Sequence, residues 1–251
     1  MSSEEAAKGR YVYCVILCPR KTNFGRIGID NNEVYTIPYR NLSAVVHDCP
    51  EEPYKGNDET VKGYVMKHHD VVDAIWQKFD AILPMRFDMI VKGEENVKQW
   101  LKAEHENFEE KLEKFKGKVE VAVQIYWDPK AIGEKIADTS IQIKKLRDEM
   151  QTKPKAMTYY YDMKIQEALK KDIETEADEW FRKFYDRIKT HAEDIRVEKL
   201  KKEKNRQMLM NLALLIDKGT IEPLGTDLAE IREVKTFDVR FTGPWPPYSF
   251  A

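Results

Sequence analysis

The stretch MLMNLALLI, residues Met208–Ile216, decides the fold of the second half of this chain. Eight of its nine residues are apolar, and Asn211 is the exception. A strand that carries apolar side chains on both faces is typical of the buried centre of a sheet. The sequence therefore predicts a central strand here, with further strands beside it.

Three other segments supply those strands. Val119–Trp127 and Phe237–Phe241 alternate apolar and polar residues, and the shorter Ile195–Val197 reads as an outer strand. A helix is predicted over 222–234, and a charged turn over 201–205. The order from residue 119 is β-α-β-β-α-β, the ferredoxin-like pattern, in which the first and third strands are central. The most apolar strand occupies the third position, so composition and topology agree.

A helical insertion over about residues 130–192 separates the first two of these strands. Asp128-Pro129 is a helix start, because the Asp side chain caps free N–H groups and Pro suits the first helical position. Lys153-Pro154 interrupts the helical pattern, and a second helix is predicted over Met157–His191. About 34 residues at 1.5 Å each give roughly 50 Å, more than one small sheet can cover. We therefore expect the two helices to form an arm.

Short strands and two helices are predicted for residues 1–117, an N-terminal α/β domain that precedes the ferredoxin-like domain of 118–251. Asn31-Asn32 separates two strand-like runs and is typical of a hairpin, because Asn tolerates positive φ. Pro84 favours an edge or strand-start position, and Gly117 ends the second helix. The expected strands are Arg10–Leu17, Ile27–Asp30, Glu33–Ile37, Leu42–His47 and an extended run over Ile82–Val91, and the expected helices are Asp58–Phe79 and Glu94–Lys116.

Composition excludes several classes of protein. Forty-two Lys and Arg against 44 Asp and Glu leave a net charge of −2, which argues against polybasic binding to nucleic acid or membranes. The longest apolar run, Tyr11–Cys18, is too short for a membrane span, and the polar N-terminus is neither a secretory signal nor a transit peptide. Cys14, Cys18 and Cys49 are too few for a disulfide framework, and we expect buried thiols in a reducing compartment.

Catalytic motifs are absent from the sequence. There is no phosphate-binding glycine loop, serine elbow or paired C-x-x-C motif. His68 and His69 are adjacent on a predicted helix and diverge by about 100°, so they do not form a metal site. His68 lies on the apolar stripe and is interpreted as a hydrogen-bonded packing residue. No catalytic residue, metal or cofactor is expected.

Two other segments each allow two interpretations. Arg86, between Met85 and Phe87, either forms a structural salt bridge or contacts an anion or a partner protein. The segment GPWPPYSF, Gly243–Phe250, favours polyproline II and carries three aromatic rings. It either folds back on its own domain or docks on another chain.

Several segments resemble the gas vesicle proteins GvpF and GvpL. The likeness spans nearly the whole chain, and its most specific element is the ending GPWPPYSF. The other matching segments are Tyr11-Val12-Tyr13, Leu42-Ser43-Ala44-Val45-Val46, His68-x-x-Val71-Val72, Ile82-Leu83-Pro84-Met85-Arg86-Phe87 and Gly117-Lys118-Val119-Glu120. The sequence departs from the family at Asp88-Met89, where the family usually has Gly-Thr.

The resemblance implies an α/β (α+β) protein of two domains, the second a modified ferredoxin-like βαββαβ domain with a long helical arm and a Pro/aromatic tail over 243–251. It also implies a non-enzymatic accessory or minor structural protein that binds the hydrophobic shell protein GvpA, and other accessory proteins, and assists gas vesicle assembly or prevents aggregation. The expected location is the gas vesicle, and the cytoplasm during assembly. The residues expected to contact partners are Arg86, Phe87, Trp245, Tyr248 and Phe250.

Two alternatives compete with this hypothesis. A nucleic-acid-binding ferredoxin-like module needs a basic sheet face with exposed aromatics, whereas strand 119–127 places Glu120 and Gln124 on its polar face. A small-molecule enzyme using His68 or His47 needs a polar pocket with perturbed titrating groups.

Overall fold

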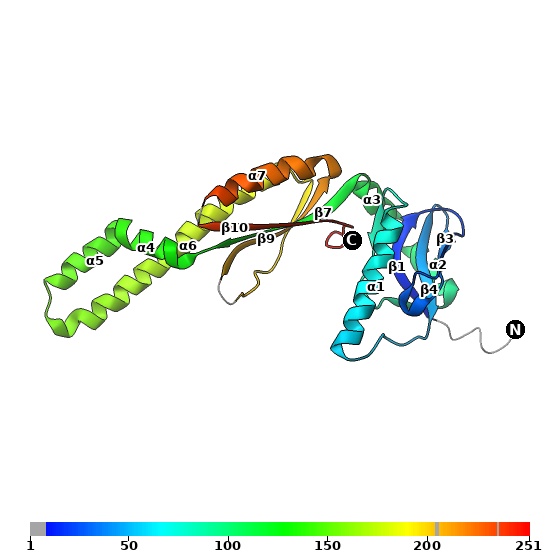
Figure 1. Ribbon diagram of the computed structural model, residues 1–251, viewed down its shortest axis with the longest axis horizontal. Coiled ribbons are helices and arrows are strands. Elements are labelled where there is room, and N and C mark those ends of the chain that lie inside the picture. Colours follow the sequence, from blue (N-terminus) through cyan, green and yellow to red (C-terminus); the bar gives the residue numbers. More distant parts are fainter. Residues whose placement is uncertain (1–8, 204–205, 235) are drawn as a thin grey trace. The chain divides into compact units, whose positions relative to one another are not determined.

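The computed structural model describes residues 9–203, 206–234 and 236–251 (Figure 1). By its internal contacts the chain divides into two units. Unit 1 is the described part of residues 1–120 together with 244–251, and unit 2 is the described part of 121–243. The expected boundary after residue 117 lies close to this division. The tail, expected with the second domain, groups with unit 1 from residue 244 onward.

Unit 1 contains a six-stranded sheet built around β1. Its strands follow the order β2-β3-β4-β1-β5, and β6 also pairs with β1. The two neighbours of β1 and the added strand all run antiparallel to it. This central position is the reason that the β1 sequence is so apolar. The strands are β1 (Gly9–Leu17), β2 (Asn23–Gly25), β3 (Val34–Tyr39), β4 (Leu42–Cys49), β5 (Ile82–Pro84) and β6 (Ile90–Lys92).

The predicted hairpin around Asn31-Asn32 is wrong in its first strand. Strand β3 pairs with β2 at residues 23–25, whereas Ile29–Asn31 form a 3-10 turn. The backbone N–H of Ile29 donates to the hydroxyl of Tyr13 at 3.0 Å, so this segment is bound to the core instead of a neighbouring strand. Asn31 has a positive φ of 60°, as its residue type allows.

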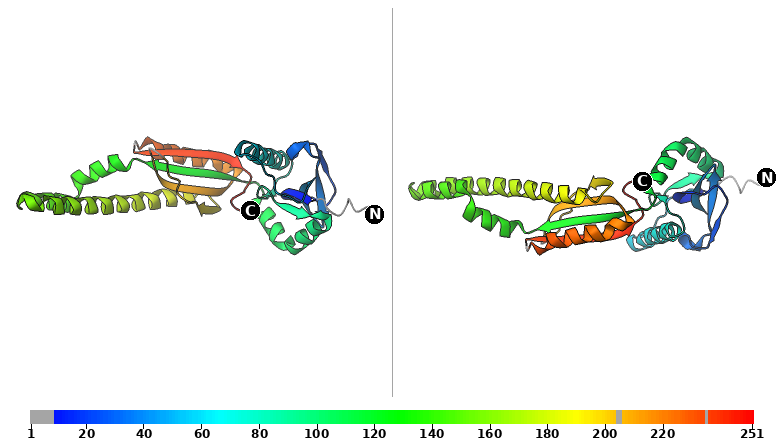
Figure 2. Two further views of the ribbon diagram at one scale, coloured as in Figure 1. Left: turned by 90° about the horizontal axis from the view of Figure 1, so that it is seen from below. Right: turned by 90° about the horizontal axis from the view of Figure 1, so that it is seen from above.

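Helices cover both sides of this sheet, with α1 on one side and α2 and α3 on the other (Figure 2). Helix α1 (Asp58–Trp76) begins where the Asn57 side chain accepts from the N–H of Thr60. The single helix predicted over 94–116 is two helices, α2 (Gly93–Ala103) and α3 (His105–Phe115), which meet at the non-helical Glu104. Gly117 follows with a φ of 68°, which suits glycine at a helix end.

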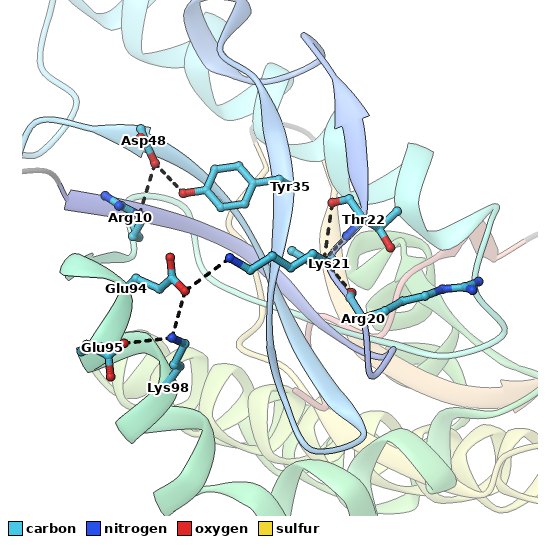
Figure 3. A network of polar contacts seen from close by, with 10 residues as sticks. Arg10, Arg20, Lys21, Thr22, Tyr35, Asp48, Glu94, Glu95 and Lys98 are labelled. Atoms are coloured by element: carbon cyan, nitrogen blue, oxygen red, sulfur yellow. Dashed lines mark hydrogen bonds and ion pairs between the residues drawn. The ribbon is translucent and has the colours of Figure 1, made fainter.

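A polar network joins β1, β3, β4 and α2 on the surface of unit 1 (Figure 3). The Asp48 carboxylate accepts from the Tyr35 hydroxyl at 2.6 Å and pairs with Arg10 Nε at 3.2 Å. On α2, the ammonium of Lys98 lies 2.9 Å from the carboxylate of Glu94, and this pairing lowers the pKa of Glu94. Arg10, Asp48, Glu94 and Lys98 are therefore paired within the fold.

Unit 2 contains a four-stranded sheet in the order β10-β7-β9-β8. Strands β7 (Lys118–Trp127) and β9 (Gln207–Asp217) are central, where the β-α-β-β-α-β pattern places its first and third strands. Strand β8 (Asp194–Val197) is an edge strand, and β10 (Phe237–Trp245) lies at the other edge. Every residue from Met208 to Ile216 is buried, as the apolar sequence predicts. Residues 204 and 205 of the expected charged turn lie outside the described residues.

The helices of unit 2 are α4 (Pro129–Thr139), α5 (Ile141–Gln151), α6 (Thr158–Lys189) and α7 (Ile221–Glu233). The predicted start at Asp128 is confirmed, because its carboxylate accepts from the N–H groups of Lys130 and Ala131. The first helix of the insertion ends at Ser140, whose hydroxyl caps α5. The N-terminal half of α6 runs beyond the sheet beside α5 (Figure 2), as expected for an arm. The chain is thus an α+β protein with two antiparallel sheets.

Candidate partner-binding site

The loop between β5 and β6, residues 85–89, contains the first two predicted site residues. Both strands pair with β1. Within the loop, the N–H of Met85 donates to the Tyr13 carbonyl at 2.9 Å, and the Met89 carbonyl accepts from the N–H of Val12 at 2.8 Å. The central strand of the sheet therefore holds both ends of the loop.

A buried pair of side chains, Tyr11 and His68, also holds this loop through hydrogen bonds. Nε2 of His68 lies 3.1 Å from the Met85 carbonyl, and Nδ1 lies 2.8 Å from the Tyr11 hydroxyl. A carbonyl only accepts, so the neutral ring carries its proton on Nε2 and accepts from Tyr11 at Nδ1. The Tyr11 oxygen in turn accepts from the N–H of Asp88 at 3.1 Å. His68 and Tyr11 thus bind the backbone on both sides of Arg86-Phe87.

Burial sets the ionisation of this pair. His68 and Tyr11 have no exposed surface. Desolvation lowers the pKa of His68 to about 4, with a smaller lowering from His69, and it raises the pKa of Tyr11. Both groups are neutral at pH 7, which agrees with the tautomer deduced from the hydrogen bonds. The prediction that His68 is a hydrogen-bonded packing residue is confirmed.

Arg86 and Phe87 point to different surroundings. The Phe87 ring packs edge-on against Tyr11 and His68, with centroids 6.2 and 6.1 Å away. Arg86 is exposed, and no acidic side chain among the described residues pairs with it. The salt-bridge interpretation of Arg86 therefore lacks a partner within the described fold. A rigid loop instead presents an unpaired guanidinium at the surface.

Asp88 closes the loop in a conformation that suits glycine. Its φ is 69°, in the left-handed region. The Asp88 carboxylate accepts from the N–H of Tyr54 at 3.0 Å. The sequence departs from the family pattern here. The hydrogen bond from Tyr54 offsets the free-energy cost of a positive φ, which a glycine would not incur.

His47, the other histidine considered for catalysis, is also a core residue. It has no exposed surface, and Nε2 lies 2.8 Å from the Tyr54 hydroxyl. Desolvation lowers the pKa of His47 to about 4. A substrate has no access to a fully buried imidazole, so the arrangement around His47 and His68 does not favour the enzyme hypothesis.

The tail after β10 docks on unit 1. The Tyr248 hydroxyl lies 2.8 Å from Nδ1 of His69 on α1. The N–H and Oγ–H of Ser249 donate to the two carboxylate oxygens of Glu120, at 2.7 and 2.6 Å. Phe250 is 5% exposed, whereas Trp245 is 39% exposed. The tail folds back on its own chain, on the first unit instead of the expected second domain.

The structure links two of the predicted site residues, Phe87 and Tyr248, through the neighbouring rings of His68 and His69. Phe87 contacts His68, whose ring contacts His69, and His69 contacts Tyr248. Phe250 is a buried anchor of the tail, and only Arg86 and Trp245 are exposed. The sequence analysis noted His69, Glu120 and Asp88 but assigned none of them a contact with the loop or the tail. The family departure at Asp88 was a usable signal, whereas nothing near Glu120 in the sequence marks its pairing with the tail.

The sheet of unit 2 was the basis for the nucleic-acid hypothesis. One of its aromatic residues, Tyr126, is 2% exposed and lies beneath the guanidinium groups of Arg206 and Arg240. These arginines pair with Asp238 and Glu203, respectively. A paired, covered ring does not offer the exposed stacking surface that base recognition needs.

The described part of the chain holds neither a cluster of metal-ligating side chains nor a membrane-spanning helix. Over residues 9–203, 206–234 and 236–251, no three His, Cys, Asp or Glu side chains converge as a metal site. No helix in these ranges has the length and apolar character to cross a membrane. The three cysteines are free and buried, as expected.

Comparison with known proteins gives a consistent result. Residues 9–251 match the family model for the gas vesicle synthesis protein GvpL/GvpF. Gas vesicle protein L1 of Halobacterium salinarum is 33% identical over 257 residues, covering 98% of this chain and 91% of that protein. Gas vesicle protein L of Haloferax mediterranei is 31% identical over 232 residues, covering 89% and 72%. The crystal structure of GvpF from Anabaena sp. PCC7120 shares the fold, with a TM-score of 0.81, 24% identity and 98% coverage of both chains.

Proposed function

The chain belongs to the GvpL/GvpF family of gas vesicle synthesis proteins, and on this premise we propose that it binds the hydrophobic shell protein GvpA. In this proposal it is an accessory or minor structural protein that assists assembly or prevents GvpA aggregation. It acts at the gas vesicle, and in the cytoplasm during assembly, and it also contacts other accessory proteins. It provides a binding surface and catalyses no reaction.

The observation that carries the proposal is that Arg86, which has no acidic partner among the described residues, lies on a loop hydrogen-bonded at both ends. Four backbone groups of residues 85–89 are hydrogen-bonded to β1 or to the Tyr11–His68 pair. Binding through such a loop costs little conformational entropy, because the loop is already ordered. Arginine presents five donors in a planar fork and is enriched among residues that dominate binding energies.

Aromatic side chains in the loop and in the tail support the same role. Phe87 is half-buried beside Arg86, and Trp245 is exposed at the end of β10. Aromatic side chains bury a large area at a low entropic cost. We propose that the sheet of unit 1 and the tail together form the surface that covers GvpA before it polymerises.

Co-purification tests the proposal. Tagged full-length chain is co-expressed with GvpA, and the GvpA retained on the tag and left in the pellet is quantified. Arg86→Ala is expected to retain less GvpA, because it removes a surface group without disturbing the core. The matched control is Arg26→Ala, since Arg26 is also an exposed arginine of unit 1. Equal retention by wild type, Arg86→Ala and Arg26→Ala would count against the role of the loop, and no retention by wild type would refute the function.

A further inference from the structure

Exposed apolar side chains gather at two places in unit 2. Met157, just before α6, and Tyr159, Tyr160 and Met163, in its first turns, have exposed fractions of 40 to 77%. We call these four residues the tip patch. Val197, the last residue of the edge strand β8, and Leu200, which follows it, are 58 and 56% exposed. They border a groove of about 360 Å³ that also has Trp127, Ala177, Phe181 and Met208 in its walls.

Two residues of the tip patch and two residues that line the groove lie on one face of α6. Eighteen residues make five turns of an α-helix. Tyr159 and Ala177 are eighteen residues apart, and so are Met163 and Phe181. The helix therefore aligns two residues of the tip patch with two that line the groove, roughly 27 Å along its axis.

Among the described residues, this face of α6 is exposed over its first half, at Tyr159, Met163, Glu167 and Lys170. The opposite side of the helix is the one that packs, with Tyr161 and Ala168 buried. Ser140, at the start of α5, donates to Asp172 at 2.8 Å, which also lies away from Tyr159 and Met163. Between the two apolar ends the free face carries Glu167, Lys170 and Glu174.

Charge is distributed unequally between the two ends. Residues 141–164, around the tip patch, include six basic and three acidic side chains. Residues 172–181, beside the groove, include five acidic and no basic side chains. Among the described residues, the charged groups that line the groove are Asp178 and Glu198. The basic, aromatic tip thus complements the two carboxylates in the walls of this apolar groove.

We propose that two copies of this chain pair through antiparallel α6 helices about a twofold axis, each tip patch lying in the groove of the other copy. Tyr159 and Met163 of one copy then pack against Phe181 and Ala177 of the second. The axis passes near Lys170, which Glu167 and Glu174 flank. Parallel pairing would place like charges together, so the charge pattern selects the antiparallel arrangement. Such an interface is isologous and closes at two copies.

Sedimentation velocity of the purified full-length chain over a concentration series tests this pairing, which does not depend on the proposed function. Wild type is expected at twice the chain mass of 29.5 kDa. Lys155→Glu/Lys164→Glu at the tip, and Glu174→Lys/Asp178→Lys beside the groove, are each expected to weaken the dimer at least about tenfold. All four changes in one chain restore complementary charges and are expected to restore the dimer.

Controls make each outcome decisive. Lys55→Glu/Lys62→Glu changes the net charge as much as the tip variant does, but on exposed residues of unit 1. It is expected to remain dimeric. Circular dichroism establishes that every variant is folded. Tyr159→Ser removes an exposed ring from the tip patch and should also weaken the dimer. The twofold pairing would be overturned if wild type is a monomer, or if the charge reversals leave the dimer unaffected. It would also be overturned if wild type forms assemblies larger than a dimer that the charge reversals abolish.

Discussion

The hydroxyl oxygen of Tyr248 lies 2.8 Å from Nδ1 of His69, across 179 residues of sequence. One residue away on α1, His68 binds the loop that presents Arg86. The same short segment of helix therefore contacts both the tail and the candidate binding loop. Changes in the core beneath α1 are expected to affect both features together.

The tail depends on Glu120 as well as on its aromatic residues. Glu120 is 7% exposed, and both of its carboxylate oxygens accept from Ser249. Glu120→Ala leaves two donors without their acceptor, and we expect the free energy of unfolding to fall by about 1–3 kcal/mol. Ser249→Ala removes only the hydroxyl and is expected to cost less. Urea denaturation measures both.

A double-mutant cycle gives the control for this prediction. If Ser249 and Glu120 interact as described, Glu120→Ala and Ser249→Ala together cost less than the sum of their separate effects. Strictly additive costs would show that the two side chains do not cooperate. Limited proteolysis at the C-terminus provides a second measurement, because release of the tail exposes it to cleavage.

Acid is expected to destabilise unit 1 through its two buried histidines. His47 and His68 have a pKa of about 4 in the fold, against about 6.5 in the unfolded chain. The unfolded chain therefore binds more protons between these values, and the free energy of unfolding falls as pH drops from 6.5 towards 4. The contribution is fully present above pH 6.5 and is on the order of 3 kcal/mol per histidine.

Acid is also expected to disturb the loop 85–89, because His68 binds it. Protonation of His68 places a proton on Nδ1, where Tyr11 now donates. Denaturant midpoints measured from pH 7 to pH 4 should fall steeply for wild type and less steeply for His68→Gln, which retains an acceptor and a donor. The same slope in wild type and in the double variant His47→Gln/His68→Gln would contradict this origin.

Asp88 provides a test of the strained end of the loop. Asp88→Ala loses the hydrogen bond from Tyr54 and keeps a side chain at positive φ, so we expect a loss of stability of about 1–3 kcal/mol. Asp88→Asn retains an acceptor in a residue that tolerates this conformation, and it is the near-neutral control. Asp88→Gly relieves the backbone and should lie between them. A stability for Asp88→Ala equal to that of Asp88→Asn would show that the hydrogen bond contributes nothing.

Strong local patterns predicted most of the elements of the fold. The apolar run Met208–Ile216 indicated a central strand, and Asp128-Pro129 indicated a helix start, because both signals act over a few residues. The helix break at Glu104 has no such signal. The first strand of the hairpin was misplaced because the bond from Ile29 to Tyr13 joins residues distant in sequence.

The candidate site was less accessible to sequence reasoning for the same physical reason. Arg86 and the aromatic tail stand out in the chain, but their surroundings depend on contacts of long range. The hydrogen-bond partners of the tail, His69 and Glu120, come from α1 and the start of β7. That Arg86 has no acidic partner within the described fold also became visible only from the surroundings of its loop.

The most direct test of the central claim is light scattering of GvpA on dilution from denaturant, with and without the purified chain. Wild type is expected to suppress aggregation up to a saturating ratio, and Arg26→Ala should behave like wild type. Arg86→Ala is expected to need at least about tenfold more protein for the same effect, as for loss of a dominant binding residue. GvpA that aggregates equally fast with and without the wild-type chain would contradict the account.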